Sequence, residues 1–399
     1  MIMGSVRLTA STAALCTAFT ASLSLAQENA SSGSGNEPLS EPGVIVVTAQ
    51  KREQNLQDVP ISISVVDGDV LQDQGAVSLA DYAGNVPGLN VTSAGTPGLS
   101  TITLRGIAPT TSSAAVGVYI DDAPVGSSSL YARGNELTLD LLPYDIERIE
   151  VLRGPQGTLY GASSIGGLLK YVTLEPDTTS FEGRIGGEIF DIQGADNLGY
   201  AAQGFVNAPV AANIAGLTAS LAYRSSPGFV DNTRGDALAN QNDYDQFGGR
   251  ISLLVEPIDA LSVELSAIHQ ETDAESNGRY AADLAGNRLG NGTSANNYLP
   301  EPFYSNFDYY AATLGYDFGG VELTSSSTYS ERETEQVIDS SLIFGTLNPV
   351  LTGGAIPEGL SRLTYTTTLD KFTQELRLTS TGSGSFQWLI GGFYTHEDS

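Results

Sequence analysis

The chain is short of the side chains that build disulfide scaffolds and metal centres. Its 399 residues include one cysteine, Cys16, and two histidines. This scarcity excludes a disulfide framework and leaves almost no material for a Cys/His metal site. Basic residues are also few, 18 against 46 acidic residues, and the net charge is −28. Because nucleic-acid binding needs a basic surface that displaces counterions, the charge argues against a nucleic-acid partner.

Long apolar runs are also missing beyond the N-terminus, which excludes a helical membrane protein. A transmembrane β-barrel is not excluded, because its strands alternate apolar and polar positions and average out to polar. We expect the acidic residues to lie largely in the linker, turns and loops.

The first 26 residues predict a cleaved signal peptide. Arg7 precedes a stretch of apolar and small residues over 8–25, and Ser24 and Ala26 supply small residues around a cleavage site. Residues 27–43 are rich in Ser, Gly, Pro and Glu, and predict a flexible linker. A run of mostly β-branched residues then begins at Val44. It is either the first strand of a domain or an exposed strand that pairs with the sheet edge of another protein.

Residues 54–176 have the pattern of a small α+β domain. Apolar alternation or β-branched runs predict strands at 59–66, 101–105, 116–120 and 148–152. A short helix is expected at 67–74, and Ser78 with Asp81 marks the start of a second.

Beyond residue 181 the pattern changes to nine longer alternating segments. We expect strands at 181–191, 198–208, 214–225, 244–256, 261–271, 307–318, 321–331, 369–380 and 386–396. Each is close to the roughly 9–11 residues that cross a bilayer with tilt. Short connections alternate with long ones around 226–243, 272–306 and 332–368. This alternation of short and long connections favours an outer-membrane barrel over a soluble β-sandwich, whose architecture does not require it.

Four motifs together resemble a TonB-dependent outer-membrane receptor. They are the run at 44–49, TITLRG at 101–106, VYIDDAP at 118–124 and IERIEVLRGPQGTLYG at 146–161. The resemblance implies a mainly β protein: a small α+β plug at 54–176, then an antiparallel transmembrane β-barrel from 181 to 399. Plugged barrels of this kind have about 22 strands, so about nine would be an incomplete barrel. We therefore expect the N-terminal part of a longer receptor, or a truncated reading frame.

The resemblance also implies a function and partners. Such receptors take up a scarce nutrient, a ferric siderophore-type ligand or another small molecule or metal chelate, using energy delivered by TonB with ExbB and ExbD. The chain would be a monomer in outer-membrane lipid, with no cofactor. The TonB box would lie within 44–50 and consist of Ile45, Val46, Val47, Thr48 and Ala49. A passive porin or adhesin, or a non-functional truncated product, is the alternative. No nucleophile–base pattern points to an enzyme.

Further site residues are implied by matching the family motifs. Arg105 and Arg153 would lock the plug to the barrel wall, with Glu147 and Glu150 either as their local partners or as solvated surface. The plug motif comprises Gly106, Gly154, Pro155, Gly157, Tyr160 and Gly161. Residues 154–161 lack the Gly-Lys-Ser/Thr of a phosphate-binding loop. Apical loops would contact the ligand through Thr96, Pro109, Thr110, Thr111 and Ser112.

Overall fold

The computed structural model describes residues 45–233, 240–279, 282–283, 285, 287, 294–355, 357–381 and 386–399. The predicted signal peptide (1–26) and linker (27–43), together with residue 44, lie outside these residues. No helix in the described part of the chain is long and apolar enough to cross a membrane.

The plug is built around a five-stranded mixed sheet in the order β3-β8-β9-β6-β7. Its strands are β3 (Ile63–Asp67), β6 (Val116–Ile120), β7 (Ala123–Pro124), β8 (Ile146–Arg153) and β9 (Gly167–Thr173). A hairpin of β4 (Leu89–Ser93) and β5 (Ser100–Leu104) and a pair of β1 (Val46–Val47) and β2 (Gln54–Asn55) lie outside this sheet. The helices are η1 (Leu56–Asp58), α1 (Gly68–Asp73), α2 (Leu79–Ala83) and α3 (Gly157–Tyr160).

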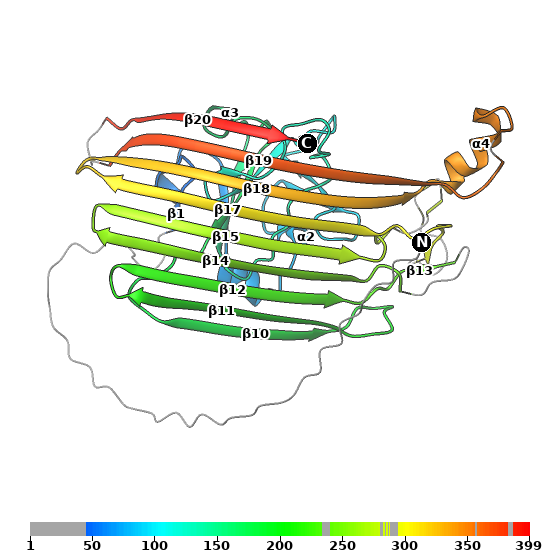
Figure 1. Cartoon of the computed structure of the whole chain (residues 1–399), viewed down its shortest axis with the longest axis horizontal. Helices are drawn as coiled ribbons and strands as arrows, with labels where there is room; N and C mark the ends of the chain where they lie inside the picture. Colours follow the sequence, from blue (N-terminus) through cyan, green and yellow to red (C-terminus); the bar gives the residue numbers. More distant parts are fainter. Residues whose placement is uncertain are drawn as a thin grey trace, which may run out of the picture. The chain divides into compact units, whose positions relative to one another are not determined.

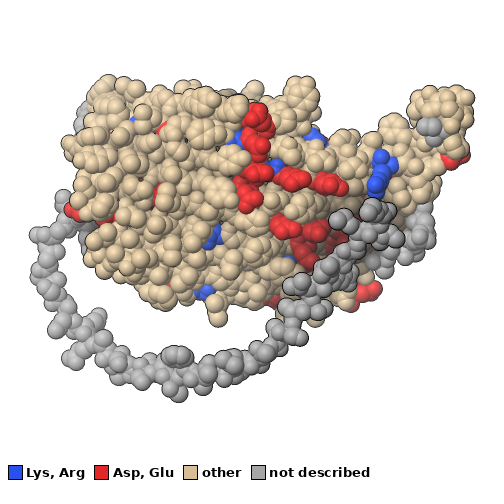
Figure 2. Space-filling view, viewed as in Figure 1, with Lys and Arg blue, Asp and Glu red and all other residues tan. Residues whose placement is uncertain are grey.

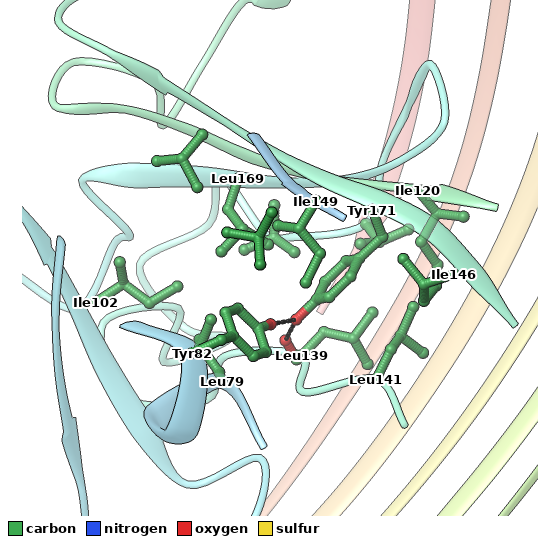
Figure 3. Close-up of a cluster of buried hydrophobic side chains, with 14 of the residues drawn as sticks. Leu79, Tyr82, Ile102, Ile120, Leu139, Leu141, Ile146, Ile149, Leu169 and Tyr171 are labelled. Atoms are coloured by element: carbon green, nitrogen blue, oxygen red, sulfur yellow. Dashed lines mark hydrogen bonds between the residues drawn. The ribbon is translucent and has the colours of Figure 1, made fainter. Parts of the chain in front are cut away.

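The plug has its own apolar core, in which β8 and β9 pack against α1 and α2. Leu71, Leu79, Ile149 and Leu169 are fully buried there. Figure 3 shows the hydroxyls of Tyr82 and Tyr171 meeting inside this cluster, 3.1 Å apart. A fully buried large apolar side chain contributes about 1.5–3 kcal/mol, so this core stabilises the plug. The later strands β15 (Leu261–Ala274) and β17 (Phe303–Asp317) add Ile268, Phe307 and Tyr309 to the same cluster.

The expected helix starts are confirmed. The Asp67 side chain accepts a hydrogen bond from the Asp69 N–H at the start of α1. At the start of α2 the Asp81 carboxylate accepts from the Ser78 N–H, at 2.9 Å. The predicted strand at 59–66 is shorter than expected and begins at Ile63, because Pro60 cannot donate to a strand ladder.

The second part of the chain is one open antiparallel sheet of nine strands, called here the wall sheet (Figure 1). Each strand pairs with its neighbours in the order of the sequence, apart from two short strands, β13 (Asp231–Asn232) and β16 (Ser294–Ala295), which pair with each other. Among the described residues β10 and β20 do not pair, so the barrel is not closed. The nine strands are β10 (Glu182–Phe190), β11 (Gly199–Ala211), β12 (Ala215–Ser226), β14 (Tyr244–Ile258), β15 (Leu261–Ala274), β17 (Phe303–Asp317), β18 (Val321–Asp339), β19 (Arg362–Ser380) and β20 (Leu389–Asp398).

All nine predicted wall strands are present, but several extend further than expected on the side of the long connections. β18 and β19 have 19 residues each, roughly 60 Å at about 3.3 Å per residue. Figure 1 shows the short connections at one end of the sheet and the long ones at the other, where η2 (Ser341–Gly345) and α4 (Thr346–Leu351) project. The expected loop at 332–368 is therefore partly strand.

The wall sheet has the burial pattern of a barrel with an apolar outside. In β12 the polar residues Thr218, Ser220 and Arg224 are buried, whereas Leu217 and Leu221 face outward. A soluble sandwich would show the opposite arrangement. The inverted pattern fits a sheet with lipid on one face and the plug on the other.

Acidic residues mark the end of the apolar outer face. Figure 2 shows carboxylates gathered across the outer surface of the strands. Like charges sit on paired positions, as in Asp245 opposite Asp273 and Glu331 opposite Asp370. Two residues from Glu331, on the same face of β18, Tyr329 pairs with Tyr310 of β17. Because facing like charges repel, these positions belong in a polar environment. The expectation that the acids lie largely in the linker, turns and loops was wrong for this group, which lies on strands.

Candidate functional site: the docked box and the plug–wall contacts

The segment with the TonB-box pattern is folded onto the plug. Val46 and Val47 pair antiparallel with Asn55 and Gln54. Val47 and Ala49 are buried, whereas Ile45 is 47% and Val46 38% exposed. The segment is therefore a strand within its own chain in this state, with its first residues open to solvent.

Three plug side chains hold the box through its polar groups. The Thr48 N–H donates to Glu150 Oε1 at 3.0 Å, and Lys170 Nζ donates to Thr48 Oγ1 at 2.8 Å. The Tyr160 hydroxyl donates to the Ala49 carbonyl at 3.0 Å. Glu150 and Lys170 are register partners on β8 and β9, so the plug sheet itself presents one carboxylate and one ammonium side by side beneath the box.

Two residues beyond the box, Lys51 forms a buried ion pair with Glu375 of β19. Arg377 on the same strand pairs with the plug's Asp122, which also pairs with Lys170 at 3.0 Å. Burial alone would raise the pKa of Asp122, but Lys170 and Arg377, with help from Lys51, hold it well below its usual range. The box, the plug sheet and the wall sheet are thus joined by one chain of charged side chains.

The wall sheet contacts the plug through apolar side chains such as Ile268 and Phe307, which belong to buried clusters shared with the plug, and through further polar groups. Arg250 Nη1 donates to the Leu174 carbonyl at 2.8 Å, and Gln270 accepts from the Leu142 N–H at 2.9 Å. At the far edge, Glu397 of β20 accepts from the backbone N–H groups of Ser128 and Ser129, each at 3.1 Å. The wall therefore holds the plug through separate hydrogen bonds and ion pairs as well as through apolar packing on β15 and β17.

The suggested local pairing of Arg105 and Arg153 with Glu147 and Glu150 was wrong. Arg105 is exposed and donates to Ser62 Oγ at 2.8 Å, and Arg153 donates to the carbonyls of Pro87 and Ile63 at 3.2 Å. Both glutamates instead contact Arg148, Glu147 at 2.7 Å and Glu150 at 2.9 Å. Both glutamates lie on β8 close to Arg148 in the sequence. Glu150 points into the plug, whereas the side chain of Glu147 is 49% exposed.

The glycine-rich motif forms a turn that brings Tyr160 under the box. Gly154 and Gly161 have φ values of +98° and +72°, and Gly106 also has a positive φ, a conformation that favours glycine. Gly157 begins α3, which ends at Tyr160, and Pro155 is exposed. The motif therefore serves to place the tyrosine hydroxyl.

The predicted ligand residues do not all share one surface. Thr110 and Thr111 are exposed, and Pro109 and Ser112 are half-buried. Thr96, in contrast, is 1% exposed and is closed off from a ligand in this state. Within the described residues, no group of three His, Cys, Asp or Glu side chains is arranged to hold a metal ion.

Sequence reasoning missed Lys51, Asp122, Lys170 and Glu375 as partners of the box. One signal was present: Lys170 stands in an otherwise apolar strand, where a charged side chain needs a partner once it is buried. Nothing local pointed to Glu375, which lies 324 residues from Lys51 in the sequence.

Comparison with known proteins gives consistent matches. The family described as TonB-dependent Receptor Plug Domain matches residues 55–168. A pesticin receptor of Yersinia pestis is 35% identical over 142 residues, 35% of this chain and 20% of the relative. A vitamin B12 transporter BtuB of Vibrio vulnificus is 36% identical over 132 residues, 33% of this chain and 20% of the relative. In fold, the chain resembles the ferric yersiniabactin uptake receptor FyuA of Yersinia pestis, with a TM-score of 0.67, 21% identity, and coverage of 84% of this chain and 48% of that one. The matches thus span about a fifth of these curated relatives and about half of the solved receptor.

Proposed function

Since the chain belongs to the TonB-dependent outer-membrane receptors, we propose that it serves energy-coupled uptake of a scarce nutrient across the outer membrane. The periplasm has no ATP, so uphill import there must take its energy from the inner membrane. We propose that TonB, driven with ExbB and ExbD, supplies that energy by pulling on Ile45–Ala49. The observation that carries this proposal is a β-branched segment ahead of the plug, half-exposed at its start and joined to the plug by a few hydrogen bonds.

The ligand belongs to this proposal. Relatives and structural neighbours are named for pesticin, vitamin B12 and ferric yersiniabactin. We propose a ferric siderophore-type chelate as the first candidate, with other small nutrients next. Its contacts would be on the exposed plug loop around Thr110 and Thr111, flanked by Pro109 and Ser112. We also propose that Arg105, which is exposed at the plug surface, helps to lock the plug to the barrel wall.

Binding of the box to TonB is the direct test. The C-terminal domain of TonB is immobilised and the purified chain is passed over it, with and without a candidate ferric chelate. Val47→Pro removes a backbone donor from the box and should reduce binding at least tenfold. Glu358→Pro, in an exposed loop next to an existing proline, is the matched control and should bind as the unmodified chain does. Equal binding by Val47→Pro would contradict the proposal.

Uptake in cells separates this proposal from a passive pore. Cells that depend on the receptor for growth on a ferric chelate or on cobalamin are compared with cells whose receptor lacks residues 44–49. Loss of growth on the deletion supports energy coupling. Unchanged uptake would show that the barrel acts as a passive porin.

A further inference from the structure

A cavity lies between the plug and strands β18, β19 and β20. Its volume is about 80 Å³, enough for several waters or one small oxyanion. Hydroxyls and backbone from the plug line one side, including Ser127, Ser128 and Ser163, and the wall contributes Arg332, Lys371 and Thr395. The lining holds two cations and no carboxylate, although acidic residues outnumber basic ones by 46 to 18 in the chain. Glu397, outside the lining, pairs with Lys371, so Arg332 is the cation of this lining without a carboxylate partner among the described residues.

Arg332 has no carboxylate partner in the described part of the chain. Its guanidinium donates only to carbonyl oxygens, Leu137 at 2.8 Å and Gly98 at 3.4 Å. Its Nε is buried and has no hydrogen-bond partner within the described residues. Taking a charge out of water without a counter-charge is unfavourable. An anion bound in the cavity would remove that cost.

The nearby carboxyl of Asp140 does little to neutralise Arg332. Burial raises the pKa of Asp140 to about 7. The hydrogen bond that its carboxylate accepts from the Leu79 N–H and the positive charge of Arg332 lower the pKa, but by less than burial raises it. Near neutral pH a large share of this carboxyl is therefore protonated. The neighbouring Asp81 acts in the same direction and raises the Asp140 pKa further.

The second cation already takes part in oxyanion binding. Lys371 Nζ donates to the Gly126 carbonyl at 2.7 Å and lies 3.3 Å from Glu397 Oε2. The same carboxylate accepts hydrogen bonds from the Ser128 and Ser129 N–H groups and from the hydroxyl of Ser127. Ser127 and Ser128 line the cavity. Glu397 thus occupies these donors, and the contact shows that the chemistry of this corner suits a carboxylate or phosphate.

The cavity also touches the residue that anchors the box. Tyr160 is part of its lining, and the Tyr160 hydroxyl donates to Ala49 of the box. Tyr119, a second lining residue, donates its hydroxyl to the Tyr160 carbonyl. An occupant of the cavity would therefore lie against the side chains that support the docked box.

We propose that this cavity binds one compact oxyanion, a carboxylate or phosphate group, with Arg332 as its main ligand and Lys371 as the second. The oxyanion is either a free ion or the anionic group of a larger solute. The site lies between the plug and β18–β20, and its lining does not include Thr110, Thr111 or the flanking Pro109 and Ser112. The proposed anion site goes beyond the proposed function, and the test of this site does not depend on TonB.

Calorimetric titration of the purified chain at low ionic strength tests the site. Inorganic phosphate is the free-ion probe, and citrate is the probe for carboxylates on a larger molecule. Saturable one-site binding of phosphate indicates a free ion, and binding of citrate alone indicates a group on a larger solute. Binding should weaken at least tenfold in Arg332→Gln and less in Arg332→Lys. Arg362→Gln, at an exposed position at the start of β19, is the control and should bind as the unmodified chain does.

A second variant guards against an effect of Arg332→Gln on folding. Thr395→Glu places a carboxylate at the cavity as a tethered anion, and should abolish the binding while raising the thermal unfolding midpoint. Saturable binding of neither probe by the unmodified chain would overturn the proposal. Equal binding by Arg332→Gln or by Thr395→Glu would overturn it as well.

Discussion

Glu150 is the plug side chain on which docking of the box most depends, and Glu150→Gln tests this. The carboxylate is fully buried and accepts from the Thr48 N–H at 3.0 Å and from Arg148 Nε at 2.9 Å. Glutamine keeps the size and one acceptor oxygen but loses the charge. Arg148 keeps an ion pair with Glu147, so the substitution leaves no buried cation alone.

The expected effect follows from the hydrogen bond to Thr48. A hydrogen bond to a charged group contributes about 1.5–3 kcal/mol, and one between neutral groups about 0.5–1.5 kcal/mol. The docked box should therefore lose about 1–2 kcal/mol, which raises the ratio of undocked to docked box by a factor of roughly 5–30. Lys170 and Tyr160 still hold Thr48 and Ala49, so part of the population stays docked.

A spin label at position 45 can measure this ratio. Ile45 is half-exposed, and the one cysteine of the sequence, Cys16, falls within the predicted signal peptide. Ile45→Cys would therefore give a single labelling site in the mature chain. The mobile fraction of the nitroxide spectrum reports the undocked box, and cleavage by trypsin after Lys51, which is buried when the box is docked, gives an independent reading.

Glu147→Gln is the matched control, since Glu147 contacts the same arginine but is half-exposed and does not touch the box. An exposed ion pair contributes about 0–1 kcal/mol, so its mobile fraction should stay near that of the unmodified chain. If Glu150→Gln and Glu147→Gln give the same mobile fraction, the charge of Glu150 does not hold the box.

Three further predictions concern the plug. Tyr160→Phe removes the hydroxyl donor to the Ala49 carbonyl and should weaken docking of the box by about 0.5–1.5 kcal/mol. The spin-label assay should show a larger mobile fraction for Tyr160→Phe and no change for Tyr131→Phe, at an exposed position. The pKa of Asp140 is raised by burial to about 7, so the folded state holds this proton more tightly than the unfolded chain, and stability should fall as the pH rises from about 4 to about 7. Asp140→Asn should flatten that slope in urea unfolding, whereas exposed Asp73→Asn should keep it; equal slopes for Asp140→Asn and the unmodified chain would contradict the assignment. Gly167→Ala should destabilise the plug by more than about 2 kcal/mol, because φ is +140° and a Cβ would lie 2.1 Å from the Leu152 carbonyl oxygen; Gly84→Ala, with open space around it, should not, and thermal unfolding distinguishes them.

The wall strands could be predicted because their signal is local. Alternation along a segment such as Leu261, Val263 and Leu265 requires no knowledge of its neighbours. The missed strand ends have a physical reason. β19 begins at Arg362, seven residues before the expected start at 369, in a stretch where four of seven residues are threonine and the apolar positions end at Tyr365. Outside the bilayer a strand needs no apolar face, so alternation ceases to mark it.

The partners of the box could not be predicted, because they depend on long-range register. Residues 45–49 stand out by composition, yet the contact with Glu150 follows from the pairing of β8 with β9 and from the path of the chain around them. The ion pair of Lys51 with Glu375 requires knowing which wall strand faces the box. Arg332 is a similar case, since its sequence neighbours Glu331 and Glu333 suggest a paired surface arginine, whereas strand alternation turns it away from both.

The contrast between the plug core and the contacts of β19 suggests how the chain would respond to a pull on the box. The core of β8, β9 and α2 is apolar, and separating its side chains would expose them to water at full cost. The contacts of β19 with the plug and the segment after the box, such as Lys51 with Glu375 and Arg377 with Asp122, are ion pairs and hydrogen bonds, which water can replace once it enters. Lys51 follows the box by two residues, so a pull reaches this ion pair before it reaches the core. We therefore expect the plug to part from the wall at β19 while its own core is still folded.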